Sequence, residues 1–249
     1  MILLDVSNFS DAADFFALEY AIAVTSPQDE FYFFWTTPPT LMLGRNQIAE
    51  QEINLNEATL RNIAIRRRFS GGGTIYTDKG TFLFSHLIIN SSDISKQLAL
   101  ETQKLTNALC NLGIPASFNS RNDILINGQK VCGAAGYSYG KYYLYHTSLL
   151  WNANFSAIDQ LLTVEISKMK RHGIQSVHQR VTSISDFCDM PFEEFKRRLS
   201  EEIVSSDSQS RFPNAEEIAL MTEYKQRFFA NEQWNMLGNK VQFSELQSF

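Results

Sequence analysis

The dipeptide Asn127-Gly128 constrains the fold of this chain more than any other local feature of its sequence. It lies between two β-prone runs, residues 123–126 and 129–135, and Asn-Gly in that setting is the strongest short-range signal for a β-hairpin. A two-residue loop determines the register of the two strands. The expected opposing pairs are Ile126 with Gln129, Leu125 with Lys130, Ile124 with Val131, and Asp123 with Cys132.

This register decides which side chains of the hairpin share a face. Side chains alternate with period two, so Lys130 is expected on the same face as Asp123 and Cys132. Lys130 and Asp123 are diagonal neighbours, within roughly 7–8 Å at Cα, so the ammonium is expected to reach the carboxylate. Residues 133–136 are all glycine or alanine and leave open volume beside the lysine. A lone lysine beside a turn is usually solvated, so Lys130 becomes significant only together with a second motif.

That second motif is RRRFSGGGTIY at residues 66–76. Glycine has no Cβ, so a ligand can lie against the backbone and contact its N–H groups. The three arginines supply the positive charge that an anionic ligand needs. A flexible turn explains a triple glycine equally well when it stands alone. Together, the two motifs predict an anion cradle with one lysine opposite it.

The composition limits the classes of function. A net charge of −5 on 249 residues argues against a dedicated nucleic-acid binder, which needs a basic surface, and favours a small anionic ligand. The 44% of apolar residues can fill a sizeable core, but no apolar run approaches the ~18 residues of a membrane span. The cysteines Cys110, Cys132 and Cys188 lie far apart without CxxC spacing, and the N-terminus shows no signal peptide. We therefore expect a cytoplasmic globular protein with reduced thiols and without nucleic-acid or membrane partners.

The order of the predicted elements indicates an α+β fold, with a mixed or antiparallel sheet flanked by helices, because helices and strands mix without strict βαβ alternation. A hairpin is expected to join residues 74–77 and 81–89 through the turn at 78–80, with Gly80 at positive φ. Residues 167–179 are expected to be a loop, 205–210 a linker, and the tail from 231 to lack an element. Helices are predicted at 12–24, 52–62, 92 or 93 to 112, 157–162, 192–204 and 215–230, and the remaining strands at 31–35, 41–43, 63–67, 116–118, 123–126, 129–135, 141–151 and 181–184.

The two motifs resemble those of the lipoate–protein ligase A family, within the biotin/lipoate ligase fold. The family patterns R-R-x-S-G-G-G-x-V-[YF] and N-D-[IL]-x-x-[ND]-G-x-K-[IV]-x-G-x-A are similar to residues 67–76 and 122–135 here. Weaker similarities are GRNQ at 44–47, HTSLL at 146–150, SVHQRVT at 176–182 and EQWN at 232–235. The resemblance implies a class II aminoacyl-synthetase-like and biotin/lipoate ligase-like catalytic domain at residues 1–190. Residues 191–249 would be a C-terminal helical extension packed on it.

The resemblance also implies a reaction. Lipoate and ATP condense to lipoyl-AMP, and a lysine of an acceptor lipoyl domain then takes the lipoyl group and releases AMP. The implied acceptors are 2-oxoacid dehydrogenase E2 subunits or the glycine-cleavage H protein. Lys130 is the implied catalytic residue, because its ammonium can offset the repulsion between carboxylate and phosphate and later polarise the acyl carbonyl. Asn122 and Asp123 would orient this lysine, or Asp123 would contact a phosphate-bound Mg²⁺.

The other implied residues contact the lipoyl-adenylate or ATP. Arg68 would contact the lipoyl-adenylate, and residues 73–76 would lie against the nucleotide. The implied set is Arg68, Ser70, Gly71, Gly72, Gly73, Thr74, Ile75, Tyr76, Gly133 and His146, besides the three hairpin residues.

Several positions depart from the family pattern. Thr77 stands where members often have histidine, and Thr147 follows His146 where glycine is usual. Many members carry a small C-terminal domain that assists adenylation, and this chain ends soon after Trp234. The resemblance then implies that a separate protein supplies that domain, that it was removed, or that the protein transfers a preformed acyl group.

Two alternative functions stay open. A lipoyl or octanoyl transferase of the same fold uses a cysteine nucleophile and no ATP. The predicted register leaves Cys132 on the face of Lys130, although the nucleophile of such transferases corresponds to the position of Ser117. A non-catalytic module would bind lipoate or its adenylate without modifying a protein. The sequence does not distinguish lipoate from octanoate.

Overall fold

Among the described residues, two β-sheets form the framework of the protein. The computed structural model describes residues 1–25, 29–89, 94–119, 122–163, 180–204 and 206–238. In this part of the chain the larger sheet is mixed, as predicted, with β11, β1 and β2 parallel and all other neighbours antiparallel. Its order is β11 (Gln209–Arg211), β1 (Ile2–Leu4), β2 (Phe31–Trp35), β6 (Thr81–Ile89), β10 (Tyr142–Leu150), β9 (Gln129–Tyr139), β8 (Asp123–Ile126) and β7 (Ala116–Phe118).

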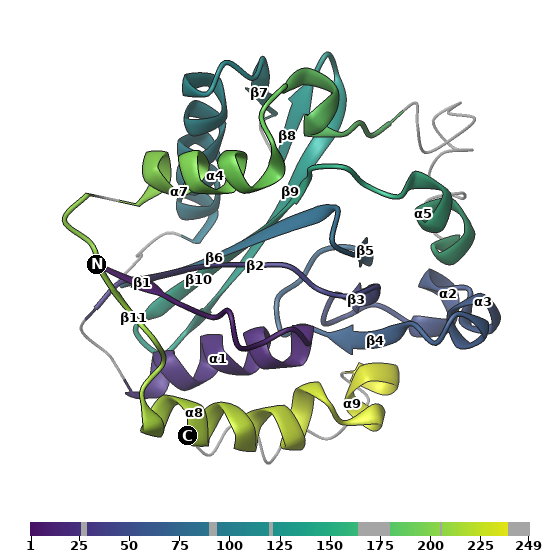
Figure 1. Ribbon diagram of the computed structural model, residues 1–249. Helices are drawn as coiled ribbons and strands as arrows, with labels where there is room; N and C mark the ends of the chain where they lie inside the picture. The colour runs from purple at the N-terminus through teal and green to yellow at the C-terminus, as the bar shows by residue number, and fades with distance from the viewer. Residues whose placement is uncertain (26–28, 90–93, 120–121, 164–179, 205, 239–249) are drawn as a thin grey trace.

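The smaller sheet lies at one end of the larger one and contains β4 (Ala64–Arg67), β3 (Thr40–Leu43) and β5 (Ile75–Thr77), in that order (Figure 1). The predicted hairpin across residues 78–80 is wrong, because β5 pairs with β3, whereas β6 pairs with β2 and β10. Gly80 is also absent from the glycines with positive φ. A Cβ on Gly80 would lie 2.0 Å from the Asn152 carbonyl oxygen, so this glycine is required by close packing.

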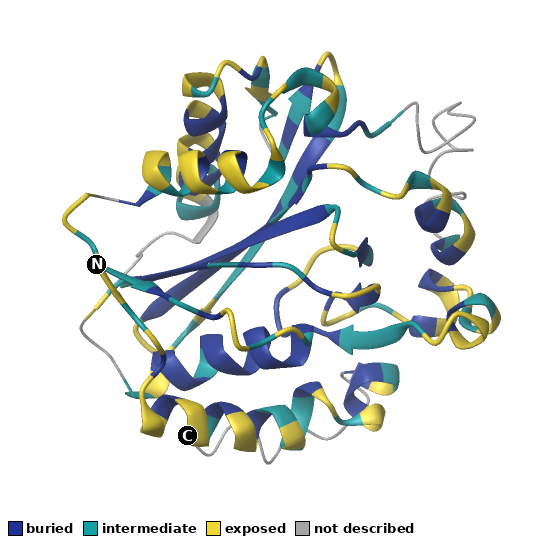
Figure 2. Cartoon of the chain, in the orientation of Figure 1, coloured by how far each residue is buried: buried dark blue, intermediate teal, exposed yellow. Residues whose placement is uncertain are grey.

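Helices cover both faces of the larger sheet (Figure 1). The helices α1 (Ala12–Thr25) and α8 (Ala215–Tyr224) lie on one face, and α4 (Ile94–Asn111) and α7 (Phe192–Ile203) on the other. Because both faces are covered, β6 is buried at every position except its last (Figure 2). None of the helices in the described ranges is long and apolar enough to cross a bilayer.

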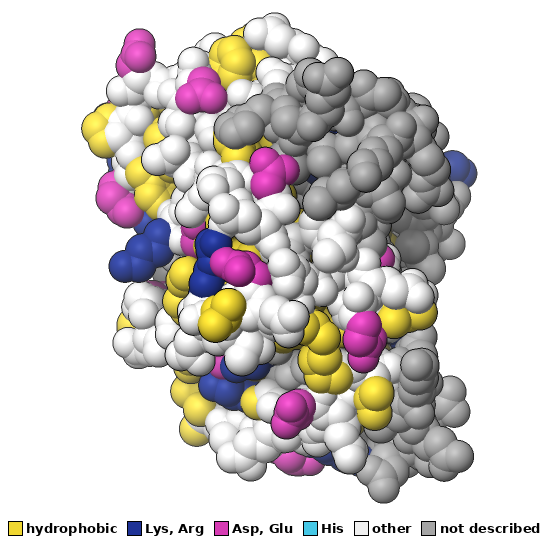
Figure 3. Space-filling model, turned by 90° about the vertical axis from the view of Figure 1, so that its right-hand side faces the viewer, with side chains coloured by type: hydrophobic (Ala, Val, Ile, Leu, Met, Phe, Trp, Pro, Cys, Tyr) yellow, Lys and Arg dark blue, Asp and Glu magenta, His cyan; other side chains and the backbone are white. Residues whose placement is uncertain are grey.

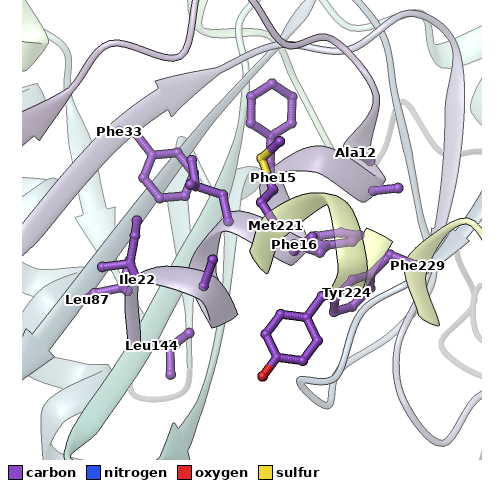
Figure 4. Close-up of a cluster of buried hydrophobic side chains, with 14 of the residues drawn as sticks. Ala12, Phe15, Phe16, Ile22, Phe33, Leu87, Leu144, Met221, Tyr224 and Phe229 are labelled. Carbon is purple, nitrogen blue, oxygen red and sulfur yellow. The ribbon is translucent and has the colours of Figure 1, made fainter. Parts of the chain in front are cut away.

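The helix α1 lies between the sheet and α8 and is buried on both sides (Figure 4). Its Phe15 stacks on Trp35 of the sheet, with ring centroids 4.4 Å apart. Its Phe16 contacts both Trp35 and Phe229, the latter from the segment that follows α8. A helix that is apolar nearly all round is typical of such a central position.

Some predicted elements differ from the observed ones. The helix expected at 52–62 is two short helices, α2 (Ala49–Glu52) and α3 (Leu55–Leu60). The helix expected at 215–230 ends as α8 and continues as a π-helical segment, Lys225–Phe229. Other short helices in the described part of the chain are α5 (Phe155–Leu161), α9 (Glu232–Leu237) and the 3-10 helix Ile184–Phe187.

Four predictions in the C-terminal part of the chain were wrong or lie outside the described residues. The strand expected at 181–184 is a single bridge between Lys130 and Val181. The expected linker at 205–210 contributes to β11. The tail beyond residue 231 contains α9, capped by the Asn231 side chain, which accepts from two backbone N–H groups. The loop expected at 167–179 is outside the described residues.

Candidate functional site

A pocket of about 160 Å³ lies between the glycine loop and the hairpin. It has an apolar part, formed mainly from α1, β2, β3 and β6, and a polar part, formed by the two sequence motifs. The residues that line it are Phe16, Trp35, Met42, Arg68, Gly72, Gly73, Thr74, Ile75, Tyr76, Leu83, Asn122, Lys130, Gly133, Ala134, Ala135, His146, Thr147, Ser148, Leu150, Ile158, Leu162, Arg180 and Val181.

Arg68 holds the glycine loop in shape. Its guanidinium donates to the carbonyl oxygens of Gly71 at 2.9 Å and Gly73 at 2.7 Å, and to Met42 O at 3.1 Å. Burial lowers the pKa of Arg68 to about 10, so the group stays charged at neutral pH. With these carbonyls directed at Arg68, the backbone of the loop turns through a conformation that favours glycine, since Gly72 has a φ of +93°.

The other two arginines of the run serve the fold. Arg66 forms an ion pair with Asp11 at 2.7 Å. Arg67 is fully buried and joins the start of the glycine loop to α9. It donates to backbone carbonyls on both sides, among them Gly44 O at 2.9 Å and Trp234 O at 3.0 Å. Three adjacent arginines therefore have three different environments, and only Arg68 lines the pocket.

The hairpin has the predicted turn, with Asn127 at φ 51° and Gly128 at φ 80°. The first two pairs of the predicted register are confirmed. A β-bulge then shifts the register, so that Ile124 faces Cys132 and Asp123 faces Gly133. The final two predicted pairs are therefore wrong.

The bulge moves Cys132 into the core between the sheet and α4. The prediction that it shares the face of Lys130 is wrong, and the thiol is fully buried. Burial raises the pKa of the Cys132 thiol to about 12. Ser117, at the position of the transferase nucleophile, is exposed on β7, with its hydroxyl on the carbonyl oxygen of Leu125. Neither residue provides an activated nucleophile.

Lys130 occupies the wall opposite the glycine loop. Its Nζ lies 2.7 Å from Asp123 Oδ1, as the diagonal placement predicted. A Cβ on Gly133 would lie 2.8 Å from the same Nζ, so the glycine leaves room for the ammonium. The backbone of Lys130 also bonds to Arg180 O and to the N–H of Thr182, which brings Arg180 to the pocket.

His146 connects the sheet with the glycine loop. Its Nε2 lies 2.6 Å from Ser70 Oγ, and its Nδ1 lies 3.3 Å from Glu19 Oε1. Nearby, Thr74 Oγ1 is buried and has no hydrogen-bond partner among the described residues. A buried hydroxyl of this kind is costly unless a ligand bonds to it.

The structure brings the predicted site residues together around this pocket. Ten of them line it directly, whereas Ser70, Gly71 and Asp123 lie behind the wall or beside it and contact residues that do. The sequence prediction missed Glu19 and Trp35, because each sits in an apolar segment without a motif. Thr77, where the family often has histidine, is buried and bonds to Thr37 Oγ1 at 2.8 Å.

On the face that Figure 3 shows, the acidic and basic side chains of the described residues are scattered. Among the residues that line the pocket, the positively charged side chains are those of Arg68, Lys130 and Arg180.

Comparison with known proteins finds similar chains of one family. The model of the lipoyl protein ligase A/B catalytic domain matches residues 11–204. The lipoate-protein ligase LplJ of Bacillus subtilis is 30% identical over 86% of this chain, which spans 65% of that relative's length. Lipoate–protein ligase 1 of Staphylococcus aureus is 29% identical over 98% of this chain and 76% of its own length.

A solved structure shares the fold. It comes from an archaeal lipoylation system of Thermoplasma acidophilum, described as a bi-partite lipoate protein ligase and its E2 lipoyl domain. It superimposes with a TM-score of 0.83 at 26% identity, covering 94% of this chain and 95% of that one. The predicted ligase-like fold class is confirmed by this likeness.

Proposed function

The chain belongs to the lipoyl protein ligase A/B catalytic domain family, and from this premise we propose that it is an ATP-dependent lipoate–protein ligase. It would activate lipoate as lipoyl-AMP, with release of pyrophosphate. It would then pass the lipoyl group to the ε-amine of a lysine on an acceptor domain, with release of AMP. The relatives from Bacillus and Staphylococcus, both named as lipoate–protein ligases, support this assignment.

One observation carries the proposal: a buried, charged arginine in the glycine loop and a lysine on the hairpin line the same pocket. An acyl-adenylate has an anionic phosphate beside a polar acyl carbonyl, and the two cations suit these groups. The ammonium of Lys130 is oriented by Asp123 and lies against backbone that lacks a side chain at Gly133. Such a preorganised donor stabilises charge as it develops on the carbonyl oxygen.

The glycine loop supplies the second part of the proposed site. In the proposal, Gly72 and Gly73 let the nucleotide approach the backbone, and the Thr74 hydroxyl donates to it. Ile75 and Tyr76 form the adjoining wall. Arg68 binds the adenylate with the donor capacity left after its contacts with the loop carbonyls.

The acyl tail would occupy the apolar part of the pocket. Phe16, Trp35, Met42 and Leu83 line it and offer no charged group to the tail. Burial of a hydrocarbon tail stabilises binding by about 0.8 kcal/mol for each methylene. Both lipoyl and octanoyl chains satisfy this chemistry.

The described residues do not by themselves form a dedicated Mg²⁺ site. No group of three or more potential ligands from His, Cys, Asp and Glu exists among the described residues. The Asp123 carboxylate is already engaged by Lys130. Mg²⁺ usually binds through substrate phosphates with one or two carboxylates. We therefore assign the chain no step that depends on the ion.

The partners belong to the proposal too. The acceptor would be the lipoyl domain of an E2 subunit or an H protein, and the Thermoplasma system, with its E2 lipoyl domain, supports the first. The bi-partite nature of that ligase supports a separate accessory protein that completes adenylation. We further propose that residues 1–190 form the catalytic domain, that 191–249 form its helical extension, and that the protein acts in the cytoplasm.

The test uses a purified apo lipoyl domain as acceptor. A mass increase by one lipoyl group that requires lipoate, ATP and this protein is the expected result. Lys130→Ala should abolish it without unfolding the protein, since the lysine lies at a partly exposed hairpin face. If lipoyl-AMP modifies the domain but lipoate with ATP does not, the proposed transfer step would stand, and the adenylation step would need a partner protein. No modification by either donor would leave a binding module.

The transferase alternative has a matching experiment. Octanoyl carrier protein, without ATP, would replace lipoate and ATP as donor. The burial of Cys132 disfavours this route, because a thiol with its pKa near 12 is not a nucleophile at neutral pH. Cys132→Ala is expected to keep full transfer activity.

A further inference from the structure

A chain of buried hydrogen bonds links α1 to the pocket, and the steps proposed above make no use of it. Trp35 Nε1 donates to Ser85 Oγ at 3.0 Å, and Ser85 Oγ donates to Glu19 Oε1 at 2.8 Å. The same carboxylate oxygen lies 3.3 Å from His146 Nδ1. All four residues are buried, and only 2% of the Glu19 side chain is exposed.

The chain continues from the histidine into the glycine loop. His146 Nε2 lies 2.6 Å from Ser70 Oγ, which also accepts from Arg68 Nε at 3.1 Å. Ser70 is fully buried at the start of the loop, and its carbonyl oxygen accepts from the N–H of Arg45 at 2.9 Å. The three glycines that follow have no side chains with which to hold the loop, so its shape depends on such anchors.

The donors and acceptors allow one tautomer of His146. An ionised carboxylate only accepts, so Nδ1 must carry the hydrogen that faces Glu19. Nε2 then accepts from the Ser70 hydroxyl, which in turn accepts from Arg68. In the other tautomer, Nε2–H and Arg68 Nε–H would both point at Ser70 Oγ, and Nδ1 would oppose a carboxylate oxygen. That arrangement leaves a buried hydroxyl hydrogen unpaired, which is costly.

We propose that Glu19 is a positioning residue for the pocket. Its carboxylate holds His146 in the Nδ1–H tautomer, and His146, through Ser70, holds the glycine loop in the conformation that receives an acyl-adenylate. The choice of an acyl-adenylate as the ligand rests on the proposed function, whereas the assignment of the His146 tautomer does not. Buried networks whose members are all satisfied make a structure rigid.

The protein contains a matched control on the opposite face of the same sheet. Glu101 is also buried, with 4% exposed, and its Oε2 lies 2.9 Å from His86 Nδ1. Neither residue lines the pocket. Glu19→Gln and Glu101→Gln therefore remove the same buried charge beside a histidine. Glutamine presents either an oxygen or an NH₂ group to the ring, so it no longer selects a tautomer.

Three measurements separate the roles. The first is the ¹⁵N NMR spectrum of histidine-labelled protein, with His146 assigned from a His146→Gln variant. The second is the dissociation constant for 5′-O-(lipoylsulfamoyl)adenosine, a stable analogue of lipoyl-AMP. The third is the thermal midpoint of unfolding.

We expect the wild type to carry the His146 proton on Nδ1. In Glu19→Gln the spectrum should show both tautomers, and the analogue should bind about tenfold more weakly, equivalent to about 1.4 kcal/mol. Glu101→Gln should lower the thermal midpoint and bind the analogue as the wild type does.

Three contrary results would overturn the inference. A wild-type His146 protonated only at Nε2 would do so even if Glu19→Gln failed to fold. Unchanged affinity of Glu19→Gln, or an equal loss in Glu101→Gln, would show that Glu19 contributes only general stability. A wild type that does not bind the analogue would instead refute the proposed ligase function, and the tautomer would still be measured.

Discussion

Gly133→Ala tests directly where the ammonium of Lys130 must lie. A Cβ on residue 133 would fall 2.8 Å from Lys130 Nζ and 3.0 Å from its Cε. Ordinary contacts of a Cβ begin at 3.4 Å, so Nζ must withdraw by about 0.6 Å or more. The end of a lysine side chain moves easily, and Gly133 does not have positive φ, so alanine fits the strand itself.

The effect on activity should exceed the effect on stability. The ion pair with Asp123 is partly exposed, at 28% and 21%, and pairs of this kind contribute about 0–1 kcal/mol. A misplacement of about 1 Å in a positioned group costs up to about 100-fold in rate. We therefore expect transfer to slow about 10- to 100-fold, or about 1.4–2.7 kcal/mol in barrier, with unfolding changed by less than about 1 kcal/mol.

The assay is a single turnover from preformed lipoyl-AMP to an apo lipoyl domain, followed by mass spectrometry. Gly128→Ala at the tip of the same hairpin is the control. Its added Cβ would meet no atom within 4 Å, but its φ of +80° makes alanine cost about 1–2 kcal/mol. It should lower stability and keep the transfer rate. A wild-type rate in Gly133→Ala, or an equal loss of rate in Gly128→Ala, would refute the assigned position of the ammonium.

Three further predictions concern residues outside this contact. Arg67→Lys should destabilise the protein by at least about 2 kcal/mol in denaturant unfolding, because one ammonium cannot donate to carbonyls on both sides of the guanidinium. An unchanged unfolding midpoint would argue against the role of Arg67 in joining the glycine loop to α9. Iodoacetamide at about pH 8 should modify exposed Cys110 and spare Cys132, whose pKa is raised to about 12 by burial; rapid modification of both would contradict the buried placement. Burial raises the pKa of Asp11, but hydrogen bonds and charge interactions, including those with Arg66, outweigh burial and hold the pKa of the folded protein below 3.8. The stabilisation that Asp11 contributes is therefore complete above pH 3.8 and is lost as the pH falls through the lower, folded-state pKa. The difference in unfolding free energy between wild type and Asp11→Asn should therefore shrink below about pH 4, and a constant difference would contradict the pair.

The hairpin shows how far local sequence rules reach. Asn127-Gly128 predicts the turn and the first two pairs, because positive φ at both residues is a local property of the chain. The bulge beyond them lies outside these rules. Val131 and Cys132 both face the core against α4, and burying two consecutive side chains requires a break in the alternation.

The turn at residues 78–80 fails for a related reason. Its composition is typical of a hairpin, but β6 finds its partners elsewhere, and β5 joins the smaller sheet. Strand pairing is decided by long-range burial, so a turn motif does not determine which strands lie side by side. The short helix α9 was missed because its main anchor, Arg67, is far away in the sequence.

The glycine motif and the hairpin lysine are determined by the sequence itself, because backbone freedom and strand alternation act over a few residues. Through the family that they resemble, those motifs also predicted the fold class and ten of the residues that line the pocket. Tertiary structure decided which of three consecutive arginines faces the pocket, on which face Cys132 lies, and that Glu19 meets His146 across 127 positions of the chain. The reason is physical: a buried polar group needs a partner, and only the packed sheet and helices determine which distant group that partner is.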